Sequence, residues 1–188
     1  MKHIKKFEAN KNKEHPFLQA AKNGSSSKVK YFIKKGVDVN MVDIEGRTAL
    51  MLASWNSYLI IVKLLVDSAD VNMVNIEGRT ALMMASTPKI INLLLDAGAN
   101  VNIKNNRNEN VVMSWLNYLQ SIIKLPIFEK IIKNGLDLDA DNGHGQNFYD
   151  MLKNKKTPLI EIEQYIDEHF PQYKDKWEMN QNVNKYNL

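Results

Sequence analysis

The sequence contains no cysteine, and this absence excludes several kinds of chemistry. A disulfide framework, a thiolate metal site and a cysteine nucleophile all require that residue. Glycine is also sparse, with eight residues among 188, and the glycines are spaced as turn residues rather than as a phosphate-cradling loop. Because a chain without cysteine suits a reducing compartment, we expect a cytoplasmic protein.

Long apolar runs are missing as well. Runs such as residues 58–62 are far too short to cross a bilayer, which takes about 20 residues. The first residues are positively charged, but no apolar run follows them, so we expect no secretory signal peptide. Delivery by a secretion route that needs no such signal stays open.

Patterns that carry chemistry are also absent. No two histidines have the i, i+4 spacing of a helical metal site, and no serine lies in a G-x-S-x-G pattern. Residues 137–143 resemble a calcium loop at first. However, Asn142 stands where an EF-hand needs glycine, and Phe148 stands where it needs glutamate. We therefore predict no enzyme, no metal, no cofactor and no small-molecule ligand.

The net charge of +4 is unevenly distributed. Residues 1–35 hold ten lysines against two glutamates, whereas the rest of the chain is slightly acidic. A lysine-rich end can bind nucleic acid or an anionic membrane. No arginine is mixed with these lysines, so we interpret them first as a solvated cap and do not expect nucleic acid as the partner.

What the sequence does contain is a duplication. Residues 38–54 read DVNMVDIEGRTALMLAS, and residues 70–86 read DVNMVNIEGRTALMMAS. The two copies differ only at the pairs Asp43/Asn75 and Leu52/Met84. Self-similarity at this offset indicates a helical repeat array, in which each unit buries its apolar face against its neighbours.

The repeated unit predicts a turn followed by two helices. Gly46 can take the positive φ of a tight turn, and Thr48 is placed to cap a first helix over residues 49–55. After a loop at Asn56 and Ser57, a second helix is predicted over residues 58–66.

At these residues the chain resembles the ankyrin repeat family, whose pattern is D-x-x-G-x-T-P-L-H-x-A, then I-V-x-L-L-L and G-A-D-V-N. The first part is matched by Asp43, Gly46, Thr48, Leu50 and Ala53. Residues 61–72 match the later parts, and residues 78–102 match the pattern again. The resemblance, to a protein of bacterial type, implies an all-α fold. It would be an α-solenoid of stacked helix-turn-helix repeats with β-turn-like connecting tips.

The resemblance extends through divergent copies over residues 14–170. It implies five repeats, at about residues 14–42, 43–74, 75–104, 105–141 and 142–170. Residues 1–13 are then a basic N-terminal extension. Residues 171–188 are a C-terminal tail that we expect to fray.

Several positions depart from the family pattern. Ala-Leu-Met replaces Pro-Leu-His in both strong copies, so we expect Met51 and Met83 to fill space as apolar packers. The third repeat lacks about three residues in its helix–helix loop, where Pro88 stands. The fourth repeat carries extra residues between Trp115 and Ile127, which predicts a longer first helix. We expect Trp115 itself to lie in the core.

In proteins of this family, partners meet the tips and the inner face of the first helices. Carried over copy by copy, the resemblance implies partner-binding residues in three repeats. They are Ile44, Glu45, Arg47, Trp55, Asn56 and Val74 in the second repeat, Ile76, Glu77, Arg79, Thr87 and Lys104 in the third, and Arg107, Asn117 and Tyr118 in the fourth.

Acidic and basic residues alternate on these tips, as Glu45/Arg47, Glu77/Arg79 and Arg107/Glu109. Arg47 and Arg79 could simply pair with the neighbouring glutamates. Trp55 is either an exposed anchor for a partner or a cover for the helix–helix loop, packed against Tyr58. We interpret the chain as a module that binds an unidentified partner protein. The alternatives are an inhibitor or immunity-type protein that blocks one enzyme, and nucleic-acid or anionic-membrane binding through the lysine-rich end.

Overall fold

The computed structural model describes residues 14–118, 124–154 and 159–186. This part of the chain contains eleven helices and no strand, so the fold is all-α as predicted. The chain divides into two compact units, the first ending at Gly98 and the second beginning at Ala99. The single domain over residues 14–170 and its five repeat boundaries stay predictions.

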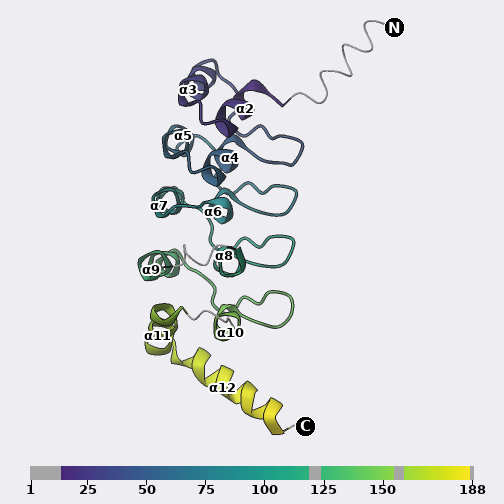
Figure 1. Ribbon diagram of the computed structural model, residues 1–188, viewed down its shortest axis with the longest axis vertical. Helices are drawn as coiled ribbons and strands as arrows, with labels where there is room; N and C mark the ends of the chain where they lie inside the picture. Colours follow the sequence, from purple (N-terminus) through teal and green to yellow (C-terminus); the bar gives the residue numbers. More distant parts are fainter. Residues whose placement is uncertain (1–13, 119–123, 155–158, 187–188) are drawn as a thin grey trace, which may run out of the picture. The chain divides into compact units, whose positions relative to one another are not determined.

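The first unit consists of three helix pairs. They are α2 (Pro16–Lys22) with α3 (Ser26–Lys34), α4 (Ala49–Trp55) with α5 (Leu59–Leu65), and α6 (Ala81–Met84) with α7 (Pro88–Asp96). The first helices α2, α4 and α6 pack in one row, and α3, α5 and α7 pack in a second row beside them (Figure 1). The pairs therefore repeat by translation within this unit, as stacked solenoid repeats do.

The duplicated unit forms the helices that its sequence predicts. Helix α4 begins after Thr48, whose side chain accepts a hydrogen bond from Met51 N at 3.2 Å. Thr80 caps α6 in the same way at 3.3 Å. The two methionines in the Ala-Leu-Met segments, Met51 and Met83, are buried between neighbouring helices, as expected.

The deletion in the third repeat shortens its first helix and leaves the following loop unchanged in length. Helix α6 has four residues where α4 has seven, whereas the loop before Pro88, residues 85–87, is as long as the loop over residues 56–58. Proline is tolerated there because the first N–H groups of a helix have no partner within the helix. The residues missing from the third repeat are therefore missing from α6, and the prediction that placed the gap in the helix–helix loop at Pro88 is wrong.

Asparagine side chains in the segments that follow the second helices connect successive helix pairs. Asn40 Oδ1 accepts a hydrogen bond from Asp70 N at 2.8 Å, and Asn72 Nδ2 donates one to Gly98 O at 3.3 Å. In the second unit, Asn102 Nδ2 donates to Gly135 O at 2.7 Å. The two glycine carbonyls lie just after the second helices, where carbonyl groups lack partners within the helix, and the asparagine amides supply donors to them.

The second unit holds α8 (Val111–Tyr118), α9 (Leu125–Lys133), α10 (Phe148–Lys153), α11 (Ile160–His169) and α12 (Pro171–Tyr186). Helix α8 packs on α10, and α9 packs on α11. Trp115 is fully buried, as predicted. Residues 119–123, where the predicted lengthening of the first helix falls, lie outside the described residues.

The C-terminal segment is a helix and not a frayed tail, so that prediction is wrong for residues 171–186. Helix α12 packs against α10 and α11. It buries Tyr173, whose hydroxyl hydrogen-bonds to Asp139, so apolar burial and a paired polar group hold its first turn. The prediction rested on the asparagine and lysine content and overlooked this tyrosine.

Polar side chains tie α10 to α11 at the same end of the second unit. The hydroxyl of buried Tyr149 donates a hydrogen bond to Asp167, and Lys153 Nζ lies 3.0 Å from Glu163 Oε2. Burial, together with the negative charge of Asp167, raises the pKa of Tyr149. This tyrosine therefore stays neutral and stays a donor at ordinary pH.

A glycine substitution tests the packing between the first two helix pairs. Gly24 and Gly36 both have positive φ, 75° and 76°. A Cβ on Gly24 would lie 2.9 Å from the Tyr58 ring, whereas one on Gly36 would meet nothing within 4 Å. We expect Gly36→Ala to lower the free energy of unfolding by about 1 kcal/mol through backbone strain. Gly24→Ala should lose a further ~1–3 kcal/mol, because the ring must move. Urea unfolding measures both, and equal losses would contradict this packing.

A pH titration tests how α12 is attached. Burial and the hydrogen bond to Asp139 raise the pKa of Tyr173 from 10.0 to about 12. The folded state therefore holds this proton more tightly than the unfolded state. The resulting stabilisation is complete below pH ~10 and is lost as the pH rises through about 12. We expect wild type to unfold at a higher temperature than Tyr173→Phe below pH ~10, with the difference shrinking between pH ~10 and ~12. A difference that is constant over this range would argue against the bond.

Candidate functional site

The tips that connect successive helix pairs share one local geometry. In each tip, the Oδ1 of the first residue accepts hydrogen bonds from the backbone N–H groups two and four positions later. In the second repeat these bonds measure 2.9 Å and 2.9 Å, and in the third they measure 3.0 Å and 2.8 Å. The residues that accept them are Asp43, Asn75, Asn105 and Asn142. Aspartate and asparagine both carry this oxygen, so the tip keeps its shape with either residue.

The second and third tips contact each other directly within the first unit. Ile76 N donates a hydrogen bond to Glu45 O at 3.1 Å. Gly46 lies at this contact with φ at 71°, and a Cβ on it would be 3.1 Å from Ile76 N. The two tips therefore present their side chains as one surface.

Arginine–carboxylate pairs cover this surface. Arg47 Nη1 lies 2.9 Å from Glu45 Oε2, and Arg79 Nε lies 3.2 Å from Glu77 Oε2, which confirms the pairing considered from the sequence. Arg47 Nε also lies 2.8 Å from Asp43 Oδ2, a contact that was not predicted. The i, i+4 spacing of Asp43 and Arg47 was the signal that could have found it.

Aliphatic side chains project from the same tips. Ile44 is 89% exposed and Ile76 is 65% exposed, and Val74 is exposed beside them. These residues therefore have no core to fill, as the sequence indicated. Exposed aliphatic groups that gather at one place on a surface mark an interaction site more often than scattered ones do.

A depression of about 220 Å³ lies between the two tips and the helices behind them. It brings together six of the predicted residues: Glu45, Arg47, Trp55, Ile76, Glu77 and Arg79. Leu52, Asn75 and Met84 complete its lining and were not predicted as site residues. Ile44, Asn56, Val74 and Thr87, although predicted, are not among the lining residues.

Trp55 is the largest exposed side chain at the depression. It ends α4, and 54% of its surface is exposed. Its backbone oxygen accepts a hydrogen bond from Ser86 Oγ at 3.4 Å. The Tyr58 ring instead packs over Gly24 of the preceding helix pair. This placement favours an exposed anchor over a cover for the helix–helix loop.

Two predicted residues beside the depression sit at helix ends. Asn56 Nδ2 donates a hydrogen bond to Leu52 O at 2.8 Å and so closes the last turn of α4. Thr87 stands at the start of α7 and is partly exposed. The bond to Leu52 gives Asn56 a structural role.

The predicted residues of the fourth repeat belong to the second unit. Glu109, expected to be a surface charge opposite Arg107, is buried and accepts hydrogen bonds from Asn105 Nδ2 at 2.9 Å and from Asn117 Nδ2 at 2.7 Å. The predicted alternation of surface charges is therefore wrong at this tip. The two amide donors are what make the buried carboxylate tolerable.

The remaining predicted residues of this unit differ in their placement. Lys104 Nζ donates a hydrogen bond to Asp141 O at 2.8 Å and so joins two consecutive tips. Arg107 is exposed on its tip. Tyr118 ends α8, and its side chain lies outside the described residues.

The calcium-like stretch forms backbone turns. Asp137 Oδ1 accepts hydrogen bonds from Asp139 N at 2.9 Å and Ala140 N at 3.2 Å, and Asp141 Oδ1 accepts one from Gly143 N at 2.6 Å. These carboxylates thus bond to nearby N–H groups. Across the described residues, no group of three or more histidine or acidic side chains is placed to hold a metal ion.

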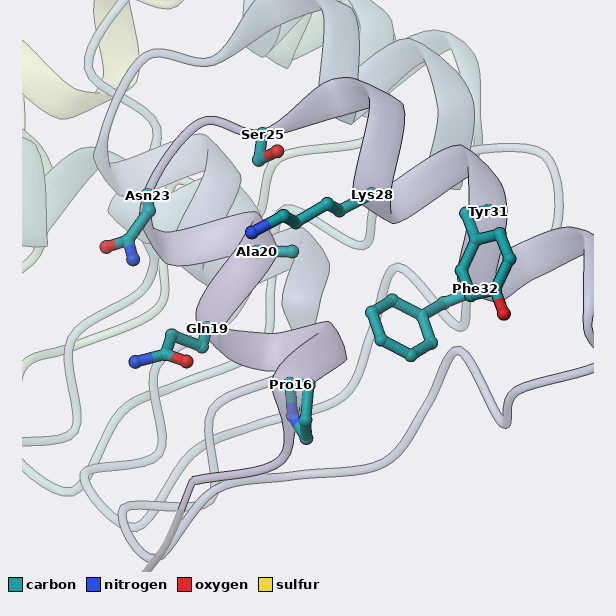
Figure 2. A pocket seen from close by; sticks show the side chains of 8 residues that line it. All are labelled: Pro16, Gln19, Ala20, Asn23, Ser25, Lys28, Tyr31 and Phe32. Carbon is teal, nitrogen blue, oxygen red and sulfur yellow. The ribbon is translucent and has the colours of Figure 1, made fainter.

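A second depression, of about 340 Å³, lies on the first helix pair (Figure 2). Figure 2 shows Lys28 reaching from α3 across to the side of Asn23, with the rings of Tyr31 and Phe32 at the other end. Among the residues that line this depression, Lys28 is the one with a charged side chain. None of the residues predicted to bind a partner lines this depression.

Comparison with known families supports the repeat architecture. The family model described as ankyrin repeats, three copies, matches residues 2–75 and 17–105, which together span more than half of the chain. The match does not test the count of five repeats or the bacterial type. A search of the curated proteins found no match.

No described helix is both long and apolar enough to cross a membrane. Ankyrin repeats are in general protein–protein interaction modules and are not typically enzymes. The chain belongs to the ankyrin repeat family.

Proposed function

We propose that this chain binds a partner protein through the second and third tips and the depression behind them. The observation that carries the proposal is Trp55, which is 54% exposed at the end of α4 among paired charges and exposed aliphatic groups. Tryptophan and arginine are the residues at which binding energy concentrates in protein interfaces. Apolar anchors within a polar rim are also the usual composition of such interfaces.

The geometry supports recognition by shape and charge. The two tips are hydrogen-bonded to each other, and the Asp43 and Asn75 side chains hold the backbone of each turn. A pre-organised backbone loses little conformational freedom when a partner binds, which lowers the entropy cost of binding. A specific complex centred here should bury roughly 1,200–2,000 Å² in total, which requires contact beyond the depression itself.

Neighbouring exposed residues extend the proposed surface. Ile44, at 89% exposed, and Val74 lie on the same two tips and can supply apolar contact at the rim.

An inhibitor that blocks one enzyme would use the same surface, and the partner's identity decides between the two interpretations. The cytoplasmic location stays a prediction. The lysine-rich residues 1–13, the basis of the nucleic-acid and membrane alternative, lie outside the described residues.

Removal of the tryptophan tests the proposed surface. The partner is first captured on the immobilised full chain and identified by mass spectrometry, and the purified partner is then titrated against each variant. Trp55→Ala should weaken binding by about 2 kcal/mol or more, roughly thirtyfold, with little change in circular dichroism. The matched control is Tyr31→Ala, because Tyr31 is 57% exposed but lines the other depression.

Tyr31→Ala should leave the affinity as it is in the wild type. Unchanged affinity in Trp55→Ala, or a larger loss in Tyr31→Ala, would reject the proposed surface. The second of these outcomes would move the binding site to the first helix pair.

A further inference from the structure

We infer that the depression between the second and third tips takes a linear segment of the partner, with an apolar side chain next to a carboxylate. The apolar side chain would lie on Trp55, and the carboxylate would pair with Arg79 and not with Arg47. This inference rests on the proposed function and specifies the chemistry of what that site binds.

The differences between the duplicated copies fall at this depression. Only two pairs differ within residues 38–54 and 70–86, namely Asp43/Asn75 and Leu52/Met84. Three of these four residues line the depression: Leu52, Asn75 and Met84. The differences between the copies therefore fall mostly on residues that line the depression, although Leu52 and Met84 also belong to the buried core.

The change from Asp43 to Asn75 removes a charge without changing the turn. Both side chains use Oδ1 to accept hydrogen bonds from the backbone two and four positions on. The second carboxylate oxygen of Asp43 holds Arg47 Nε at 2.8 Å. Asn75 carries an amide nitrogen at the equivalent place, which cannot accept from a guanidinium. The third tip therefore has one negative charge fewer beside its arginine.

The two arginines consequently differ in how firmly the chain neutralises them. Arg47 pairs with Asp43, whose side chain is only 5% exposed, and with Glu45, whose side chain is 50% exposed. Arg79 pairs with Glu77, whose side chain is 59% exposed, at 3.2 Å. An exposed ion pair contributes little stability, and its glutamate can turn away at small cost. A carboxylate from a partner can thus replace Glu77 on Arg79. A partner carboxylate could also replace the exposed Glu45 on Arg47, but the buried carboxylate of Asp43 would still neutralise that arginine.

The apolar part of the site lies beside this arginine. Trp55 and Ile76 form exposed walls, and Met84, only 7% exposed, also lines the depression. Methionine adapts its shape to different apolar groups more readily than the Leu52 of the preceding copy. A volume of about 220 Å³ is below the size of ordinary small-molecule pockets. It suits one side chain of a longer segment better than a whole small ligand.

The charges also argue against a nucleic acid here. Glu45 and Glu77 both line the depression and are both exposed, so they would repel a phosphate backbone. One incoming carboxylate that replaces Glu77 avoids most of that repulsion, since Glu77 can turn out into water. The observations therefore favour an acidic and apolar protein segment.

The test uses the full chain and a phage-displayed library of random linear peptides as the probe. The library is selected on the wild-type chain, and single peptides are then titrated against two variants. Asn75→Asp gives the third tip the charge that the second tip already carries, so the turn should be retained. Asp43→Asn makes the reciprocal change and is the matched control.

We expect the selected peptides to carry aspartate or glutamate within a few positions of an aromatic or aliphatic residue. Asn75→Asp should weaken their binding about fivefold, because it restores a competing carboxylate to Arg79. Asp43→Asn should not weaken it. Trp55→Ala should also weaken it, which places the peptide at this depression.

Each other outcome overturns the inference. Peptides without acidic enrichment, or acidic peptides that bind Asn75→Asp as tightly as wild type, would exclude Arg79 as the residue that recognises a carboxylate. Failure to enrich any peptide would exclude a short linear segment as the ligand. In these cases the proposed function is still decided separately, by the titration of the captured partner against Trp55→Ala.

Discussion

Burial of apolar surface between consecutive helix pairs is the constraint on which the rest of the first unit depends. Helices as short as α4, with seven residues, are not stable by themselves in water. They persist because each pair covers the apolar face of the next, with Leu50 and Leu82 fully buried between the rows. Each helix pair therefore needs a neighbour of matching shape, and duplication of a segment supplies such a neighbour.

Because the helices carry the core, the tips are free to vary in charge. Each tip keeps its turn through one side-chain oxygen, which aspartate and asparagine share. Exchange of Asp43 for Asn75 therefore alters the electrostatics of one arginine and leaves the backbone bonds in place. The charge of a tip can change from one repeat to the next in this way while the turn is kept.

The parts of the fold that follow from local sequence signals were predictable. Thr48 caps the start of α4, and Pro88 is the first residue of α7; both residue types favour helix starts for local reasons. The bounds of α4 agree with its predicted range of residues 49–55. Helix α12 was missed because its first turn is held by contacts from Tyr173 to groups distant in the sequence. Glu109 was placed on the surface for the same reason, since the amide of Asn117, eight positions away, is what allows its burial.

By itself, the sequence determined the repeat period, the helix starts, the family and a set of exposed tip residues, because each depends on residues close together in the chain. Only the tertiary structure decided which of these residues share a site. Trp55, Arg79 and Met84 meet because one helix pair packs on the next, and the distance between copies in space cannot be read from their separation in the chain. The structure also decided that Arg47 is held by a buried carboxylate, whereas Arg79 is paired with an exposed one, since burial is a property of the packed surroundings.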